Sequence, residues 1–254
     1  MAAIDKPKLR NAYKKIKASA EPLVGVGDPA EISQEILDVL AALSGLKPVC
    51  VLGRGLDDKG WIANVSDIAA TIGLHVAGGP LWDAMPWAAT FRGTKLPDWY
   101  VDHCRDELAQ HRAVYIWRTQ AAGSAVQIVN ASGGKLSIAD EARLLGFPEC
   151  CVAAFYQRAL RYHGATISKL GRYGRNDEKQ MRALMEGEGN MSPSTEQEIA
   201  DLQAAFAIQP APFGSWNMCD SCIASDAGPS ANLSMRYREL AAAVDQEIVA
   251  ALSS

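Results

Sequence analysis

The sequence lacks the features that place a chain in a membrane, outside the cell or on nucleic acid. No apolar run approaches the length of a membrane-spanning helix, and the amino terminus lacks the continuous apolar segment of a secretory signal. We therefore expect a cytoplasmic protein without a membrane span. The formal net charge is -4, so a broad positive surface is absent and nucleic acid is not an expected partner.

Low-complexity segments are also absent. Of the 254 residues, 48% are hydrophobic, which excludes a disordered chain and supplies the side chains of a substantial core. Only residues 6–17 are locally basic, and there lysines and Arg10 alternate with the apolar Leu9, Tyr13 and Ile16. This alternation predicts a helix with a solvated face in an amino-terminal extension, residues 1–27.

Helix and strand signals alternate through residues 28–134. A capping residue, Asp28, and Pro29 begin a predicted helix that ends at Gly45. Further short helices are predicted at 66–73 and 97–110, and strands at 48–53, 74–77, 113–117 and 125–129. The first two strands form a predicted βαβ unit and the last two a hairpin. We expect an α/β or mixed α+β fold, with a small mixed sheet and helices in the front half.

The pattern of residues 135–254 is helical. Ser137 is a candidate cap for a helix over 138–145, and a second apolar helix follows over 152–160. Further helices are predicted at 177–186, 194–206 and 232–252. This back half forms the third predicted region.

Cysteine is scarce, since the chain has six, but four of them form two tight pairs in the helical back half. Cys150 and Cys151 are adjacent, and Cys219 and Cys222 enclose two residues. Pro148 suits the first position of a helix, where unpaired N–H groups and the helix dipole favour thiolates. A reducing compartment disfavours disulfides. The four thiols therefore predict a metal site that joins distant helices.

Burial is the plainer interpretation, because cysteine is among the most buried residue types and either pair alone is consistent with small core residues. Two pairs in one chain of ordinary composition favour the metal site. Cys50, within a short apolar run, and Cys104, within a predicted helix, are interpreted as structural.

The segment from Leu145 to Val152, LGFPECCV, resembles the motif of a prokaryotic family of unknown function whose members carry an LGYPECC-like sequence. Similar sequences have a later cysteine pair followed by an Arg-Tyr element, matched here by Arg236-Tyr237. The resemblance covers residues 143–240. The chain departs from the family pattern in Phe147, where the motif has tyrosine, and in having only two residues between the later cysteines. The resemblance implies that the four cysteines act together.

Four thiolates suit zinc or an iron–sulfur cluster. Adjacent cysteines are strained as ligands of one tetrahedral ion, whereas a cubane offers separate irons to neighbouring cysteines. We therefore expect a 4Fe-4S cluster held by Cys150, Cys151, Cys219 and Cys222, with zinc as the alternative. The triplet of cysteines typical of radical-SAM enzymes is absent.

An iron–sulfur protein of this kind is expected to have a redox or cluster-assisted role on a small molecule, as an oxidoreductase or lyase if it is an enzyme, or to act with a redox partner protein. Two alternatives stay open. One is a thiol-redox or soft-metal-binding protein in which Cys150 and Cys151 are a reactive dithiol. The other is a structural zinc-binding interaction module.

Polar residues near the cysteines are candidates to support the metal or a substrate. They are Glu149, Arg158, Arg161, His163, Asp220 and Ser221. The commoner interpretation of Arg158 and Arg161 is a solvated helix face, and that of His163 a carboxyl-terminal cap of the same helix.

Overall fold

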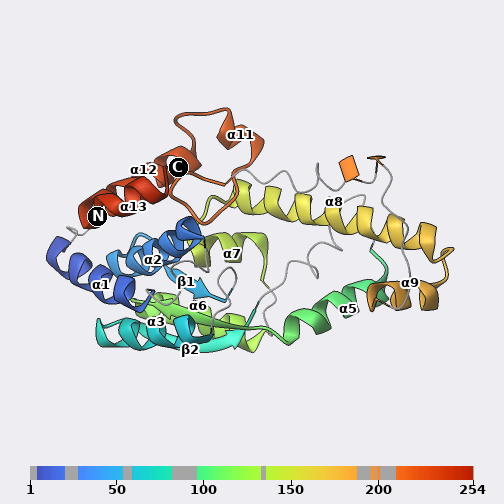
Figure 1. Ribbon diagram of the computed structural model, residues 1–254, viewed down its shortest axis with the longest axis horizontal. Helices are drawn as coiled ribbons and strands as arrows, with labels where there is room; N and C mark the ends of the chain where they lie inside the picture. Colours follow the sequence, from blue (N-terminus) through green and yellow to red (C-terminus); the bar gives the residue numbers. More distant parts are fainter. Residues whose placement is uncertain are drawn as a thin grey trace.

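The computed structural model describes residues 5–20, 28–53, 59–81, 96–132, 136–187, 196–197, 199–200 and 210–253. Figure 1 shows an elongated molecule in which both ends of the chain lie at one end and the long helix α8 (Glu149–Tyr173) runs toward the other. Helices α5 (Asp98–Ala109) and α9 (Glu178–Met185) pack near the far end of α8. Among the described helices, none is both long and apolar enough to cross a membrane.

A three-stranded antiparallel sheet lies near the chain ends. Its strands are β1 (Val49–Leu52), β2 (His75–Pro80) and β3 (Arg112–Trp117), in the order β1-β3-β2. Val49 lies opposite Trp117, and Pro80 opposite Arg112. The mixed α and β fold is thus confirmed, and β1, the helix after it and β2 form the predicted βαβ unit in a split form, with a third strand inserted between its two parallel strands. β1 and β2 do not pair, because β3 lies between them and is antiparallel to both.

Helices cover both faces of the sheet because its side chains alternate between two cores. Cys50, Leu52 and Ile116 pack into one core together with α1 (Lys6–Ser19), α2 (Pro29–Ser44) and α3 (Lys59–Thr71). Val49 and Tyr115 point to the other face, toward α6 (Gln120–Ala131) and α7 (Ile138–Leu145). The result is three layers, helix on sheet on helix.

The strand predicted at 125–129 is wrong, and with it the hairpin. These residues belong to α6, which Thr119 caps by accepting a hydrogen bond from the N–H of Ala122. Ala122, Val126 and Val129 are buried at helical spacing, whereas Ile128 is 64% exposed. A short apolar run has no clear period, and here packing against the sheet favours the helix.

Most other predicted elements are confirmed, with shifted ends. Asp28 caps α2, and Gly45 ends it in the left-handed conformation. The helix predicted at 66–73 begins earlier, at Lys59, and the run over 232–252 is two helices, α12 (Pro229–Val244) and α13 (Gln246–Ala251), separated at Asp245. The helix predicted at 194–206 lies largely outside the described residues.

Helix α1 belongs to the main core. Its apolar face, Leu9, Ala12, Tyr13 and Ile16, is buried, while its lysines are exposed as the alternation predicts. The same core includes residues of α2, α12 and α13, so it draws on all three predicted regions of the chain. The boundaries predicted between those regions stay predictions.

Candidate metal centre

The first cysteine pair is positioned by a tight connection between α7 and α8. Gly146 ends α7 with a φ of 71°, in the left-handed region that favours glycine. The sequence predicts Pro148 as the first helical residue. In the structure Pro148 is the N-cap of α8, and the helix begins one position later, at Glu149. Cys150 and Cys151 therefore lie in the first turn of α8, as the sequence predicts.

The second pair brackets a single turn of helix. Cys219 is the N-cap of α11 (Asp220–Ile223), and its carbonyl accepts hydrogen bonds from the N–H groups of Cys222 and Ile223. A tight turn before it is closed by the N–H of Ala211, which donates to the carbonyl of Trp216. This turn and α11 carry the pair to the start of α8.

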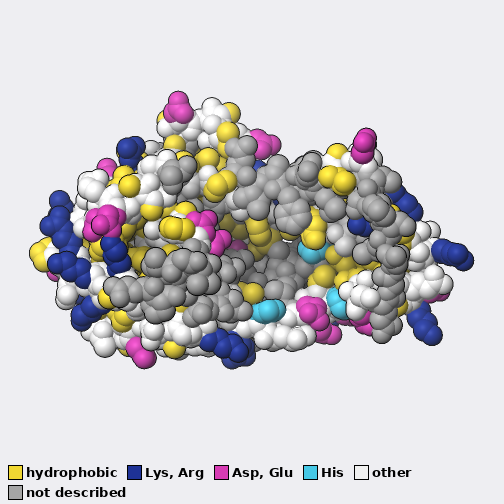
Figure 2. Space-filling model, in the orientation of Figure 1, with side chains coloured by type: hydrophobic (Ala, Val, Ile, Leu, Met, Phe, Trp, Pro, Cys, Tyr) yellow, Lys and Arg dark blue, Asp and Glu magenta, His cyan; other side chains and the backbone are white. Residues whose placement is uncertain are grey.

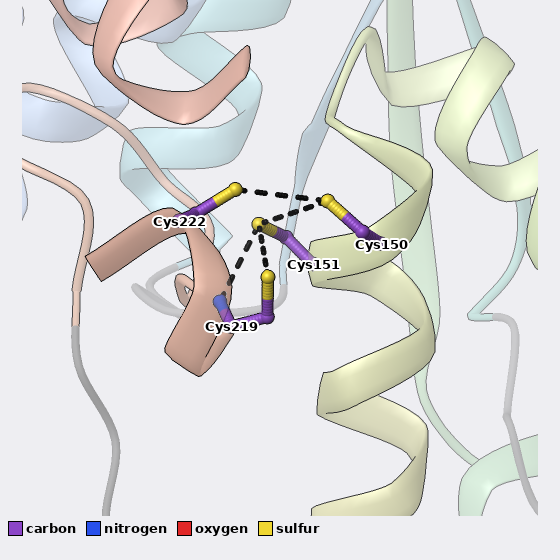
Figure 3. Close-up of side chains that lie close together, drawn as sticks. All are labelled: Cys150, Cys151, Cys219 and Cys222. Carbon is purple, nitrogen blue, oxygen red and sulfur yellow. Dashed lines mark hydrogen bonds between the residues drawn. The ribbon is translucent and has the colours of Figure 1, made fainter. Parts of the chain in front are cut away.

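The four sulfurs converge. Figure 3 shows Cys150 and Cys151 on α8 pointing toward Cys219 and Cys222 on α11. All four sulfur atoms lie within 4.8 Å of one another, and they form a group able to hold a metal ion. The Sγ of Cys150 is 3.9 Å from that of Cys151 and 3.6 Å from that of Cys222, and the Sγ of Cys151 is 3.8 Å from that of Cys219. We call these four residues the cysteine cluster.

These three separations match those of a tetrahedral single-ion site. With zinc–sulfur bonds of about 2.3 Å, the sulfurs of a tetrahedral site lie about 3.8 Å apart. Cys150 and Cys151 reach that separation although they are adjacent in the chain. A cubane, by contrast, binds each thiolate to a different iron and requires wider spacing. The donor set of four cysteines suits either group.

The cysteines differ in how readily they lose a proton. Burial disfavours the thiolate of Cys219, but hydrogen bonds from Ser221, from the backbone of Cys222 and from neighbouring thiols outweigh it and lower its pKa to about 6. Desolvation and hydrogen bonds with the other thiols raise the pKa of Cys150. Desolvation also raises the pKa of Cys151. Both shifts oppose the thiolate character that the sequence predicts for the first turn of α8.

A shell of polar and aromatic side chains holds Cys151. Its Sγ lies 3.1 Å from the Oγ of Ser230, which also accepts a hydrogen bond from the indole N–H of Trp216 at 3.1 Å. The N–H of Cys219 donates to the same sulfur at 3.4 Å. Trp216 packs against the rings of Phe147 and Tyr237, with centroids 5.3 and 5.6 Å away.

Arg158 also joins the two halves of the site. It donates to the carbonyl of Met218 at 2.8 Å and pairs with Asp220 at 3.6 Å, and its side chain is only 11% exposed. The solvated-face interpretation is therefore wrong for Arg158. Ser221 contacts the sulfur of Cys219 at 3.1 Å.

The remaining candidates do not join the cluster. Glu149 and Arg161 are exposed. His163 is a dozen residues further along α8, about 18 Å at the helical rise, where its Nδ1 bonds the hydroxyl of Tyr100 at 2.8 Å. Because α8 continues to Tyr173, the predicted helix end at His163 is wrong. Burial lowers the pKa of His163.

Cys50 and Cys104 lie away from the cluster. Cys50 is 1% exposed within the main core, and burial raises the pKa of its thiol. Cys104 is partly buried against the hydrophobic cluster of α5, α8 and α9. Both positions agree with the structural role predicted for them.

Sequence reasoning missed Ser230 and Trp216. Ser230 follows Gly228-Pro229, a pattern that predicts a helix start but not a contact with a sulfur 79 positions away. Searches against family models, curated proteins and solved structures found no match to the chain.

Proposed function

We propose that the cysteine cluster holds a metal through all four thiolates and thereby fastens the start of α8 to α11 and α12. The observation that carries this proposal is the convergence of four sulfurs, from residues up to 72 positions apart, within 4.8 Å. Metal binding contributes directly to folding at such sites, because the unfolded chain does not hold the ligands together.

A single zinc ion is the first candidate. Its tetrahedral bonds fit the three sulfur separations of 3.6 to 3.9 Å. With four thiolates the ion has no open position for a substrate, so its role is structural. This corresponds to the zinc-binding module among the predicted alternatives.

An iron–sulfur cluster is the second candidate, with electron transfer as its role. The observation that favours it is the exposure of Cys150, which places one edge of the cysteine cluster at the molecular surface. A redox partner protein can approach a cluster most closely at such an edge. When bound, the cluster would accept and release one electron while its four ligands stay fixed. The sulfurs must move further apart to admit a cubane. For this reason the iron–sulfur cluster is the second candidate.

The resemblance to the LGYPECC family agrees with a joint role of the four cysteines, and we propose membership of that family on the motif alone. A small-molecule substrate, a redox partner and a cytoplasmic location are likewise proposals.

Metal and acid-labile sulfide analysis of anaerobically purified protein, with its absorption spectrum, tests these proposals. One zinc per chain without sulfide supports the single ion, and equal iron and sulfide with visible absorption supports the cluster. Cys219→Ser and Cys222→Ser should lose the metal, whereas the control Cys104→Ser should keep it. Protein with no metal and four titratable thiols would contradict both candidates and support the reactive dithiol.

A further inference from the structure

A cavity of about 420 Å³ lies beside the cysteine cluster, between α2, α7 and the start of α8. Cys151 forms part of its wall, and residues 215–217 close another side. The volume is that of a small-molecule site. Figure 2 shows acidic side chains beside a hollow on this face, over the part of the molecule where α2 and α7 lie in Figure 1.

Carboxyl groups dominate the polar lining of the cavity. Glu31, Glu35 and Asp38 lie along one face of α2, four and three residues apart, and Glu141 faces them from α7. Their depth varies, since Glu31 is exposed whereas Asp38 and Glu141 are buried. An arriving ligand therefore meets carboxyl groups from the mouth to the interior.

Lys47 is the single cationic residue among the lining residues that the structure describes. Its ammonium donates to Asp38 at 2.6 Å and to Ser215 at 3.0 Å, and it lies 4.7 Å from the centroid of the Phe147 ring. These contacts hold its charge against Asp38, so the cavity keeps an excess of negative groups. An anionic ligand would face repulsion there.

The rest of the lining is apolar and partly aromatic. Phe147, Phe155 and Trp216 contribute rings, and Val152 and Leu145 contribute aliphatic groups. Aromatic faces attract organic cations as well as apolar groups. The lining therefore matches a ligand with a positive head and an apolar body.

A metal ion is a poorer occupant of the cavity. The cysteine cluster is the one group in the described chain whose His, Cys, Asp or Glu ligand atoms converge enough to hold an ion. The cavity's carboxyl groups are spread along its length instead.

We propose that this cavity binds a small organic cation, an amine, a guanidinium or a quaternary ammonium on an apolar group, between the carboxyl groups of α2 and the aromatic wall. Binding rests on the cavity itself, whereas any contribution of the cysteine cluster to the preference for cations rests on the proposed metal centre as well. A centre of four thiolates carries net negative charge and adds to the preference for cations.

Isothermal titration of the full chain, as purified with its metal, tests the proposal. The probes are benzylamine, agmatine and choline, with benzyl alcohol and benzoate as neutral and anionic comparisons. We expect at least one cation to bind once per chain and about tenfold more tightly than either comparison, as expected for electrostatic discrimination. Glu31→Gln and Glu35→Gln should each weaken that binding about fivefold. The control is Asp67→Asn, which removes the same charge from an exposed position on α3 outside the lining.

The proposal is overturned if none of the three cations binds, if benzoate binds as tightly as they do, or if Asp67→Asn weakens binding as much as Glu31→Gln. Metal content measured in the same samples separates the two proposals. Metal-containing protein that binds no cation contradicts only the cavity site. Metal-free, folded protein that binds benzylamine contradicts only the metal centre.

Discussion

At the scale of single residues, the thiols of the cysteine cluster ionise under opposing influences. Hydrogen bonds give Cys219 a pKa of about 6, so it is a thiolate at neutral pH without a metal. Desolvation raises the pKa values of Cys150 and Cys151, so these two keep their protons. A metal that binds all four sulfurs must therefore displace at least two protons at neutral pH.

This proton release predicts a steep pH dependence of metal affinity. Each displaced proton raises the apparent affinity about tenfold per pH unit, so a release of at least two protons gives at least about a hundredfold increase between about pH 6.5 and pH 7.5. Competition with a chromophoric zinc chelator at several pH values measures the slope. A slope of one proton or less would mean that Cys150 or Cys151 is not a ligand, or that their thiols are already ionised.

Ser230 supports the site without being a ligand. Ser230→Ala removes the hydroxyl that contacts Cys151 and accepts from the indole of Trp216, and it leaves that buried N–H without its acceptor. We expect a loss of about 1 to 3 kcal/mol in the free energy of unfolding and a loss of about tenfold in metal affinity. Urea unfolding and chelator competition measure the two effects.

Ser234 provides the matched control one turn further along α12. It is also buried, but its hydroxyl has no hydrogen-bond partner among the residues that the structure describes. Ser234→Ala should leave metal affinity unchanged and should not lower stability, because it removes an unsatisfied polar atom. Equal effects of the two substitutions would show that the hydroxyl of Ser230 has no special role at the sulfur.

At the scale of elements, the connection between α7 and α8 sets where the first cysteine pair lies. Gly146 has a positive φ, and a Cβ added there would lie 2.8 Å from the Cδ of Pro48. Gly146→Ala must therefore strain the backbone and push against Pro48, the residue before β1. We expect a loss of about 2 to 4 kcal/mol in the free energy of unfolding, more than backbone strain alone costs, and weaker metal binding.

Gly73 separates the cost of the left-handed backbone conformation from the cost of the contact with Pro48. Its φ of 88° is as unfavourable for alanine, but an added Cβ would meet no atom within 4 Å. Gly73→Ala should cost about 1 kcal/mol, from the backbone conformation alone, and leave metal binding intact. If Gly146→Ala lowered the free energy of unfolding in urea no more than Gly73→Ala, the contact with Pro48 would not contribute to the loss of stability.

The helices and strands also show which parts of the fold nearby residues in the sequence determine. Caps and periodic apolar residues predicted α2, α7 and the helix that carries Cys150, because each signal lies within a few residues of the structure it forms. The insertion of β3 between β1 and β2 and the helical state of 125–129 depend on distant partners, and neither was predicted. That the two cysteine pairs come together was predictable from the chemistry of thiols. The contact of Ser230 with Cys151 and the cavity were not predictable, because both depend on contacts between distant parts of the fold.

At the scale of the whole molecule, one core holds the two ends of the chain together. Helices α1 and α2 pack with α12 and α13, so the region that carries Cys219 and Cys222 is anchored on the front half. A polar connection crosses the same boundary. Lys47 precedes β1, bonds Asp38 of α2 and reaches Ser215 in the segment that leads to Cys219.

This connection is a buried ion pair, since the side chains of Lys47 and Asp38 are 2% and 10% exposed. Lys47→Met keeps most of the side-chain volume but leaves the carboxylate of Asp38 without its cation. We expect a loss of about 3 to 5 kcal/mol in the free energy of unfolding, measured in urea. Asp38→Asn combined with Lys47→Met should recover at least half of that loss, because the isolated charge is then gone.

Arg143 and Asp140 form the comparison, as an ion pair whose side chains are 77% and 52% exposed. Arg143→Met should change the free energy of unfolding by less than about 1 kcal/mol, because water solvates the remaining carboxylate. If Lys47→Met cost as little as Arg143→Met, Asp38 would have to take up a proton or gain water when its partner is lost. The double substitution would then give no recovery.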